Sequence, residues 1–547
     1  MSSKGFYLKS IESLQTANIP KDSILTKGLF EMKKFNTVEE IVKTKLLSED
    51  IKFEPQTIDN QLKSYIPINN NIIIWKNIAS QWLNKRSSVN LATIYHEDKK
   101  DSGISKEIAA KFKMFASHKT EEKQFLTAQE IIIMGFENSV NIKDEIYYNC
   151  FLNMEKAPER FMKLLALITS TFPSSRYKSP ILTFLHAIML GTYSLDTKED
   201  QRMKESTRYC YRRIEKSHEL GTRTTLPNEE EFRYVWNLQK IPIRVFFCNE
   251  IQLWISIESY TTVDEALQLI IKELKADEGI LRFLGLFVKY PEEFFIDDRA
   301  WVIDYAMTRR LYVKIRYFVP LKDITNKEFV NLLYIQIFSD YLKGIFPCGF
   351  EEIIELAGLA FFIEKGSQLE ENASISINKY IPKGSCKPEE VDIKEVASKV
   401  ITKYLNFRNY ITEEDAKIDF LRSLQKYDAF MAQGFSGDYI RIGVEGNGSN
   451  EEYAKREIMM YLKPFEIYLV WKQRGEIVKQ SIPFSRICEF GSLKEQKAAF
   501  FRVAGEDHEE IHLLESGKYE EIEALMKGYA AIIGKKQSKN LFIFKGD

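Results

Sequence analysis

Cysteine and histidine are both scarce in this sequence, with six of each among 547 residues. The cysteines are scattered and no two form a C-x-x-C pair, so free thiols in a reducing cytosol are expected. The amino terminus has no apolar signal core, and no run approaches the roughly 18 apolar residues of a membrane span. The sequence also lacks a G-x-x-x-x-G-K-[ST] loop and an H-C-x-x-x-x-x-R loop, which argues against a motor ATPase or phosphatase site within the chain.

A strong charge of either sign is missing as well, because the net charge at pH 7 is only -1. Such a balance gives no global field that would draw the chain to nucleic acid or to a membrane. Residues 1–237 carry a small excess of basic side chains, which weakly favours acidic partners for that part. The composition, 44% hydrophobic and 28% charged, is that of a soluble globular protein, and the length predicts three or four folded units.

The first part of the chain has a helical pattern. Residues 1–34 are weakly patterned and are interpreted as a leader or linker, whereas helical periodicity dominates residues 35–237. Pro158 opens one predicted helix, and Gly221 is the expected carboxyl-terminal cap of another. We therefore predict an all-α domain here.

Strand patterns begin after this helical region. Two alternating runs are followed by a T-x-x-E capping box at Thr262 and Glu265, an order typical of a ubiquitin-like β-grasp unit. Later, several strands precede a single last helix, which is typical of pleckstrin or phosphotyrosine-binding barrels. The β-grasp unit, a helical region, the strand-rich region and a short tail are assigned to residues 238–320, 321–433, 434–540 and 541–547.

Three segments resemble a myosin-tail-homology-4 (MyTH4) domain followed by a FERM domain. IKDEIYYN resembles the L-x-D-E-x-Y-x-Q helix of MyTH4 domains, and RYCYRRIEKSHELGTRTTLPNEEEF resembles their closing helix, although Leu220 stands where Asn is usual. EEDAKIDFLRSLQKYDAFMAQGF resembles the passage from the second FERM lobe to the third. The resemblance implies a multidomain α+β fold: an all-α MyTH4 domain, then a three-lobed FERM domain with a ubiquitin-like β-grasp, a helical bundle and a PH/PTB-like β-barrel capped by a C-terminal helix.

Such tandems occur in the tails of class VII, X and XV-like myosins and in some kinesins and adaptors. Residues 6–30 resemble the end of an SH3 domain and its linker, which suits a class VII-like myosin tail. The resemblance implies a non-catalytic cargo-binding and autoregulatory module without a cofactor or a nucleic-acid partner, in the cytoplasm, at the cell cortex and in filopodia. Its expected partners are cargo peptides, talin-like adhesion proteins or receptor tails, its own motor head and microtubules, with peripheral membrane association also open. The alternative is a motor-free FERM-type adaptor that links receptor tails to the cytoskeleton.

The segment GEDHEEIHLLESG contains H-E-x-x-H, the two-histidine motif of many zinc proteases. Zinc binding by this motif requires a helix, because only there do positions i and i+4 face the same metal. Here Ile511 and Leu513 alternate with Glu510 and His512, which predicts a strand. On a strand His508 and His512 would be about 13 Å apart at about 3.3 Å per residue. We therefore expect no metal site, and His512 on an outward polar edge of the strand.

Asp144 and Glu145 could be taken for paired catalytic carboxylates. Adjacent helical residues do not face each other, however, and acidic residues are stabilising in the first turn of a helix. With Asn141 as the expected N-cap, a structural role is predicted, with an ion pair to an arginine of a later helix left open.

Three surfaces remain as candidates for binding. The first is a basic stripe on one predicted helix, which consists of Lys204, Arg208, Arg212, Arg213 and Lys216. It is either a solvated helix face or a docking surface for acidic partners or microtubules. The second is the peptide groove of the third FERM lobe, where a peptide can add to a strand edge. The residues expected to line it, of which the apolar ones could equally belong to the core, are Ile487, Cys488, Glu489, Met526, Tyr529 and Ala530. The third is the pair Lys536 and Lys539, which resembles a basic motif for autoinhibition of the motor head. Alternatively, the two lysines only make the end of the chain more soluble.

Overall fold

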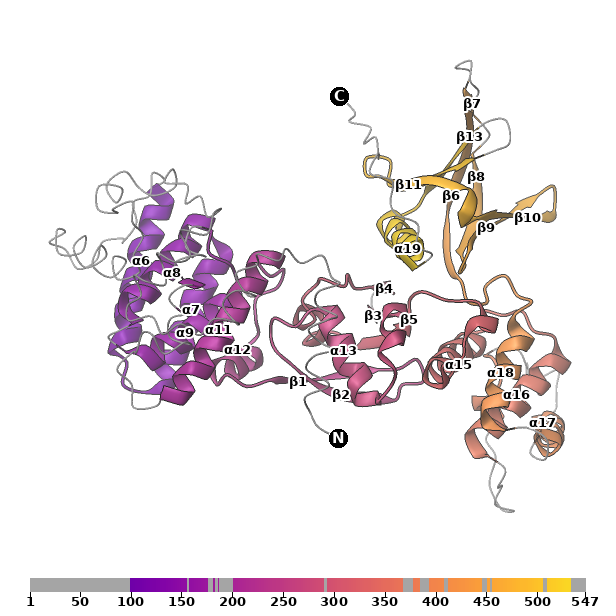
Figure 1. Ribbon diagram of the computed structural model, residues 1–547, viewed down its shortest axis with the longest axis horizontal. Coiled ribbons are helices and arrows are strands. Elements are labelled where there is room, and N and C mark those ends of the chain that lie inside the picture. Colours follow the sequence, from indigo (N-terminus) through magenta and orange to yellow (C-terminus); the bar gives the residue numbers. More distant parts are fainter. Residues whose placement is uncertain are drawn as a thin grey trace, which may run out of the picture. The chain divides into compact units, whose positions relative to one another are not determined.

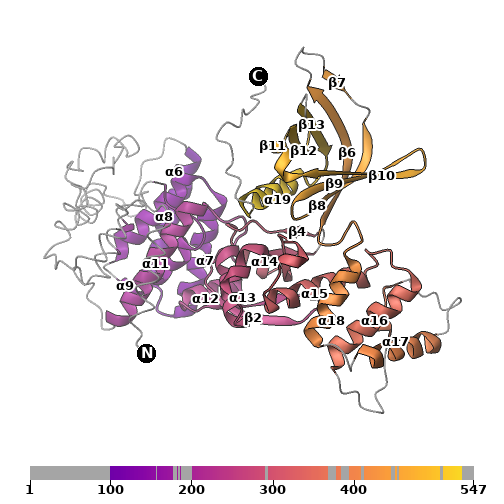
Figure 2. The same cartoon turned by 45° about the vertical axis from the view of Figure 1, so that its right-hand side comes forward.

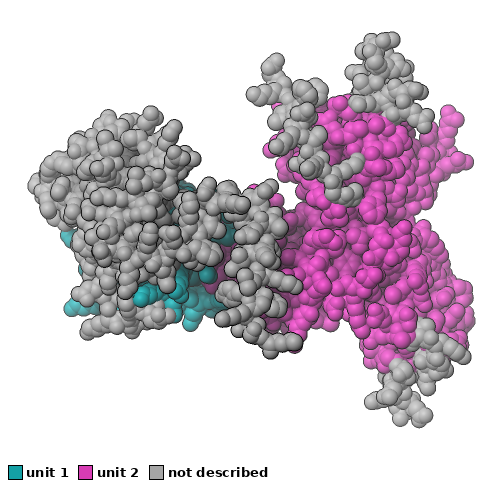
Figure 3. All heavy atoms as spheres, in the orientation of Figure 1, with its two compact units in different colours: residues 1–240 teal, residues 241–547 magenta. Residues whose placement is uncertain are grey.

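The computed structural model describes residues 99–154, 157–175, 181–182, 185, 200–289, 293–366, 377–383, 393–407, 412–444, 450–452, 455–504 and 509–532. The chain divides into two compact units, residues 1–240 and residues 241–547 (Figure 3). The described part of unit 1 is helical, and unit 2 combines helices with two sheets, so the predicted α+β class is confirmed. Within the described part of the chain, no helix has both the length and the apolar character needed to cross a membrane.

Unit 1 packs its helices around α9, an almost wholly apolar helix. The described helices are α6 (Lys99–Ser117), α7 (Glu121–Glu137), α8 (Val140–Asn153), α9 (Pro158–Thr169), α11 (Asp200–Leu220) and α12 (Glu229–Trp236) (Figure 1). From Phe161 to Thr169 every side chain of α9 except Lys163 is buried, and the helix contacts α7, α8, α11 and α12. This helix is therefore the centre of the core of unit 1.

The ends of the helices in unit 1 follow local chemistry. Pro158 occupies the first turn of α9 and Gly221, with φ of 85°, follows α11, both as predicted. The N-cap of α8 is Ser139, whose side chain accepts a hydrogen bond from the backbone N–H of Ile142, so the predicted N-cap at Asn141 is wrong by two residues.

A buried ion pair joins the last helix of unit 1 to the segment that precedes it. Arg223 and Glu231 are 2% and 1% exposed, and the guanidinium of Arg223 donates a hydrogen bond to the carboxylate of Glu231. Glu231 lies in the first turn of α12, whose N-cap Asn228 accepts a hydrogen bond from the backbone N–H of Glu231. The ion pair thus fixes α12 to the segment that follows α11.

The first lobe of unit 2 is a five-stranded sheet with the order β2-β1-β5-β3-β4, covered on one face by α13. Its elements are β1 (Ile241–Phe246), β2 (Gln252–Ile257), α13 (Val263–Leu274), η3 (Glu278–Phe283), β3 (Leu284–Val288), β4 (Phe294–Phe295), α14 (Ile303–Ala306) and β5 (Leu311–Ile315). Strands β1 and β2 pair antiparallel, whereas β1 and β5 pair in parallel. The capping box of α13, Thr262 with Glu265, is present as predicted.

The second lobe is a helical bundle built on the apolar helix α16. Its elements are η4 (Leu321–Asp323), α15 (Lys327–Leu342), α16 (Phe350–Lys365), η5 (Ile377–Lys379), α17 (Ile393–Phe407) and α18 (Glu413–Leu424). Helix α16 packs against both α17 and α18. A Cβ at Gly358 would lie 2.7 Å from Cβ of Lys403, so glycine allows α16 and α17 to approach closely.

The third lobe is an antiparallel sheet with the order β10-β9-β8-β6-β13-β12-β11 and with β7 beside β6. Its elements are β6 (Gln433–Val444), β7 (Asn450–Glu452), β8 (Arg456–Leu462), β9 (Glu466–Gln473), β10 (Glu476–Pro483), η6 (Phe484–Arg486), β11 (Ile487–Leu493), β12 (Ala498–Ala504), β13 (Glu509–Glu515) and α19 (Tyr519–Ile532). The last helix packs against β11 and β12 (Figure 2). This arrangement is the predicted strand-rich lobe capped by a C-terminal helix.

Hydrogen bonds to main-chain atoms tie the third lobe to the first. The backbone N–H of Phe318 donates to the Tyr529 hydroxyl of α19 at 3.2 Å. The side chain of Gln433 donates to the carbonyl of Arg316 at 2.7 Å, and Lys518 Nζ donates to the carbonyl of Glu293 at 3.2 Å. These bonds hold α19 and the start of β6 against the chain that leaves β5 and against the residue that precedes β4.

Candidate partner-binding surfaces

Of the two histidines in the H-E-x-x-H segment, only the second lies in the part of the chain that the structure describes. His508 lies outside the described residues, and His512 lies on strand β13, as predicted. Among the described residues, no group of three histidine, cysteine, aspartate or glutamate side chains could hold a metal ion. The predicted strand is confirmed at His512, which lies within β13.

The predicted orientation of His512 is wrong, because its side chain is fully buried instead of facing outward. Its Nδ1 lies 2.5 Å from the hydroxyl of Tyr439, and its ring stacks on Phe501 with centroids 4.8 Å apart. Strand β13 is internal, between β6 and β12, so both of its edges are paired. Burial lowers the pKa of His512 to about 4, opposed by the neighbouring carboxylate of Glu510. The ring is thus a neutral part of the core.

The basic stripe of α11 is only partly a surface. Arg208 and Arg212 are exposed, whereas Lys204 and Lys216 are half-buried. Arg213 is fully buried, so its inclusion in a binding surface is corrected. Its guanidinium lies 4.5 Å from the ring centroid of Tyr209 and donates to the hydroxyl of that residue. One residue further along a helix turns the side chain by about 100°, which moves position 213 from the face of Arg212 into the core.

The two acidic residues of α8 have structural partners. Asp144 accepts hydrogen bonds from Ser174 Oγ at 2.8 Å and from the backbone N–H and the hydroxyl of Ser175 at 2.8 and 2.5 Å. Glu145 accepts a hydrogen bond from the amide of Asn149 at 2.7 Å. Both carboxylates are fully buried, so Asp144 joins α8 to the segment after α9, and their arrangement offers no open site for catalysis.

The predicted groove of the third lobe divides into accessible and core residues. Strand β11 is at one end of the sheet order, and a register shift between Ile487 and Glu489 makes Cys488 a bulge with an exposed side chain. Glu489 is half-buried and lies 3.0 Å from Arg502. Ile487 and Ala530 are buried, so their assignment to the groove lining is corrected to the core.

Met526 and Tyr529 are fully buried, so their assignment to the groove lining is corrected to the core. Tyr529 accepts the hydrogen bond from Phe318, which explains why it points away from the surface. The remaining predicted pair, Lys536 and Lys539, lies outside the described residues.

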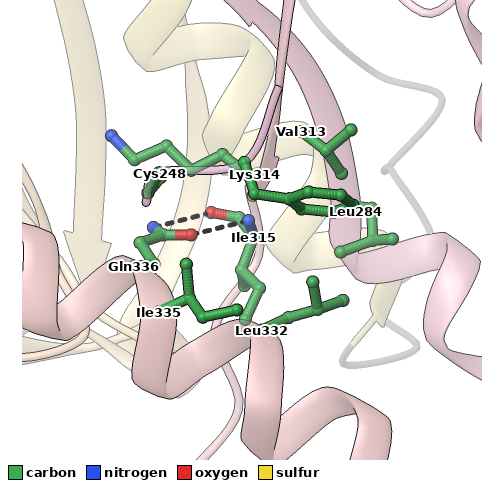
Figure 4. Close-up of a pocket in the computed structure, with 9 residues that line it drawn as sticks. Cys248, Leu284, Val313, Lys314, Ile315, Leu332, Ile335 and Gln336 are labelled. Atoms are coloured by element: carbon green, nitrogen blue, oxygen red, sulfur yellow. Dashed lines mark hydrogen bonds between the residues drawn. The ribbon is translucent and has the colours of Figure 1, made fainter. Parts of the chain in front are cut away.

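A small hollow between the first and second lobes of unit 2 could not be predicted from the sequence. It lies between β5 and α15, with side chains that include Cys248, Leu284, Lys314 and Leu332 (Figure 4). The amide of Gln336 closes one side by accepting from the N–H of Ile315 at 2.7 Å and donating to its carbonyl at 3.2 Å. Burial raises the pKa of the Cys248 thiol to about 11, so the thiol is protonated and not nucleophilic at neutral pH.

The hairpin of β1 and β2 carries an exposed aromatic and basic face that was not among the predicted binding surfaces. Trp254 and Ile251 are exposed, and the guanidinium of Arg244 lies 5.3 Å from the ring centroid of Trp254. Alternation in β2 could have indicated that Trp254 faces away from the core, because Ile255 and Ile257 face α13.

Two family models match parts of the chain. The MyTH4 domain matches residues 128–234, within unit 1, and the FERM central domain matches residues 320–435, which cover the second lobe of unit 2.

Solved structures agree in fold. The MyTH4-FERM MF1 domain of Dictyostelium discoideum myosin VII has a TM-score of 0.61 and 14% identity, covering 88% of this chain and 99% of that one. The C-terminal MyTH4-FERM domain of human myosin 7b, solved in complex with the harmonin-a PDZ3 domain, has a TM-score of 0.55 and 18% identity, covering 81% of this chain and 91% of that one.

A curated relative shares part of this architecture. Kinesin-like protein KIN-14I of Oryza sativa subsp. japonica is 22% identical over 329 residues, which are 52% of this chain. The matched part spans only 25% of the length of that kinesin.

Proposed function

We propose that this chain, a MyTH4-FERM tandem, is a non-catalytic cargo-binding and autoregulatory tail module of an actin-based, class VII-like myosin. The fold shared with myosin VII and myosin 7b domains supports this assignment, and the human domain was solved with a bound PDZ domain. The module would recognise short segments of adhesion or cytoskeletal proteins at the cell cortex and in filopodia. A fluorescent fusion found away from actin-rich protrusions would contradict this location.

The observation that carries partner binding is the open side of β11 beside α19. Among the described residues β11 pairs only with β12, and its bulge at Cys488 leaves an exposed side chain next to the edge. An unpaired edge offers N–H and C=O groups to which an extended peptide can add, while neighbouring side chains select its sequence. The arrangement therefore suits recognition of a peptide strand.

A pair of substitutions at Cys488 tests this groove. Peptides would be selected on the full chain from a random twelve-residue display library, and their affinities would be measured by fluorescence anisotropy. Because tryptophan would fill the space beside the edge, Cys488→Trp should weaken binding about tenfold or more, whereas Cys488→Ser should leave it unchanged. Equal binding by both variants, without protection of β11 amides from hydrogen exchange, would reject the groove as the site.

The exposed part of the basic stripe supports a second partner-binding surface, which lies on unit 1. Arg208 and Arg212 present two cations on the same side of α11. Acidic partner segments or the acidic surface of microtubules would be attracted to them. The partial likeness to a kinesin-like protein favours microtubules as the first partner to examine.

A motor-free FERM-type adaptor is the alternative. The same peptide groove would then link receptor tails to filaments without a motor. The full-length transcript separates the two functions, because the first requires a motor head encoded upstream of this region.

A further inference from the structure

Strand β2 is an edge strand with unusually exposed apolar side chains. It stands at one end of the sheet order and pairs only with β1 among the described residues (Figure 1). Trp254 on this strand is 56% exposed, and Ile251 directly before it is 61% exposed. Single exposed apolar residues are common on protein surfaces, so the direction of the backbone groups and the local charge decide what this edge can bind.

The backbone of three β2 residues points to the open edge. The N–H of Phe247 donates to the carbonyl of Ile251 at 2.9 Å and so fixes which cross-strand pairs are hydrogen-bonded. Hydrogen-bonded and non-hydrogen-bonded pairs alternate in an antiparallel ladder. The pairs that do not exchange hydrogen bonds with β1 are therefore Phe246–Gln252, Arg244–Trp254 and Pro242–Ser256.

Proline at position 242 agrees with this pattern, because proline has no N–H to donate. The N–H and C=O groups of Gln252, Trp254 and Ser256 consequently point away from β1. They form a row of donors and acceptors to which another strand can pair.

The two faces of the hairpin differ in chemistry. Ile255 and Ile257 are buried on the face that α13 covers, whereas Gln252, Trp254 and Ser256 are exposed on the other face. A strand that adds to β2 would continue both faces, because successive side chains alternate between them. Every second residue of that strand would therefore lie beside Ile255 and Ile257, and the others beside Trp254.

The exposed face is basic. Arg244 is exposed, stacks on Trp254 and makes no ion pair within the described part of the chain. Arg310 is 69% exposed, and its guanidinium lies 5.3 Å from the ring centroid of Phe246. The carboxylate of Glu250 lies 3.6 Å from Arg310 and neutralises part of the charge, whereas no described carboxylate forms an ion pair with Arg244. Acidic side chains on the added strand would supply a counter-charge.

We propose that the β2 edge is a second docking site, for an extended partner segment in which acidic and apolar residues alternate. The segment pairs with the backbone of Gln252, Trp254 and Ser256. Its acidic residues lie on the face of Trp254, within reach of the Arg244 guanidinium that stacks on that ring, and its apolar residues continue the face covered by α13. This site is on another lobe from the β11 groove and does not depend on it.

Two substitutions at one position separate backbone pairing from side-chain contact. Ser256→Pro removes an outward N–H without removing a hydrogen bond to β1, a change that edge strands tolerate. Ser256→Ala keeps the N–H and is the matched control. Nine-residue display peptides would be selected on the unchanged full chain, and the binding of each enriched clone would then be compared between the two variants.

The expected result is a set of peptides with alternating acidic and apolar residues. Their affinity, measured by fluorescence anisotropy, should fall about tenfold or more with Ser256→Pro or Arg244→Glu and stay unchanged with Ser256→Ala. Hydrogen exchange of the complex should show protection of Gln252–Ile257. Cys488→Trp in the other groove should have no effect, which separates this site from the proposed function.

Three results would overturn the proposal. The first is that no clone is enriched on the unchanged chain. The second is enrichment of basic peptides, and the third is equal affinity for the Ser256→Pro and Ser256→Ala variants. Circular dichroism and thermal unfolding of the Ser256→Pro chain establish that it is folded, so that lost binding reports on the edge.

Discussion

A buried pair of polar side chains in unit 1 differs in charge from one in unit 2. Unit 1 buries an ion pair between Arg223 and Glu231, whereas the third lobe of unit 2 buries Tyr439 with His512. A buried charge that loses its partner is costly, because it cannot regain the water that it lost on folding. A buried neutral group loses only a hydrogen bond when its partner is removed, but it resists becoming charged. The stability of unit 1 should therefore be sensitive to loss of the Glu231 carboxylate, and the stability of the third lobe should be sensitive to pH.

The largest effect is expected from Glu231→Ala in unit 1. This change leaves the guanidinium of Arg223 buried without its carboxylate and should lower the free energy of unfolding of unit 1 by about 3–5 kcal/mol. Hydrogen exchange of the amides in α9 and α11, measured on the full chain, reports on this unit separately from unit 2.

Glu229→Ala is the matched control, because Glu229 forms an exposed ion pair with Arg233 on the same helix at 2.8 Å. Its effect should be far smaller, since water screens exposed pairs. Similar losses for the two variants would show that burial does not distinguish these ion pairs.

The second prediction concerns pH. Burial holds the pKa of His512 at about 4 in the folded chain, below the ordinary value of about 6.5 that it has when unfolded. The unfolded state therefore binds a proton first as the pH falls, and stability should decrease between about pH 6.5 and pH 4. The steepest contribution of one such group is about 1.4 kcal/mol per pH unit.

The free energy of unfolding of the third lobe, measured in urea with hydrogen exchange as the readout at pH 7, 6 and 5, tests this dependence. His512→Gln keeps polar atoms without a titrating ring and should flatten the curve, at the cost of some stability at pH 7. The same pH dependence in the variant and in the unchanged chain would assign the effect to other groups.

A smaller loss is expected when the neutral pair loses one hydrogen bond. Tyr439→Phe leaves Nδ1 of His512 buried without the hydroxyl and should cost about 1–3 kcal/mol, less than Glu231→Ala costs unit 1. Replacing both residues, with Tyr439→Phe and His512→Leu, should recover part of the loss because neither side chain of the pair then buries a polar atom that has lost its partner. A double variant as unstable as the sum of its single changes would argue against the pairing.

The smallest effect on stability is expected for the exposed cations of α11. Arg208→Glu with Arg212→Glu should leave the unfolding of unit 1 nearly unchanged, because neither side chain is in the core. Cosedimentation with microtubules should nevertheless weaken, and its dependence on salt should become flatter. Unchanged cosedimentation would count against a docking role for these residues.

Local signals predicted much of the fold. The capping box at Thr262 and Glu265 and the helix end at Gly221 depend on neighbouring residues alone, so the sequence could show them. The order of helical and strand regions was also readable, because periodicities of about 3.6 and of 2 differ along the chain. The tandem of a MyTH4 domain and a FERM domain could be inferred from that order together with the three quoted segments.

The orientation of side chains in the third lobe was less predictable. In β13, Ile511 with Leu513 and His512 with Leu514 are two alternating sets, and either could face the core by pattern alone. Neighbouring strands and the hydroxyl of Tyr439 decide in favour of the set with His512. Arg213 was misplaced for a similar reason, since its aromatic partner Tyr209 accommodates a charge inside unit 1.

The bonds that tie the third lobe to the first end on main-chain atoms of Glu293, Arg316 and Phe318. Every residue except proline, which lacks the N–H that Phe318 donates, carries these main-chain groups, so other substitutions at these positions keep the bonding groups themselves. The surface of the first lobe can therefore diverge during evolution while α19 keeps its attachment. A new ligand-binding surface can therefore arise on one lobe without a change in how the lobes are joined.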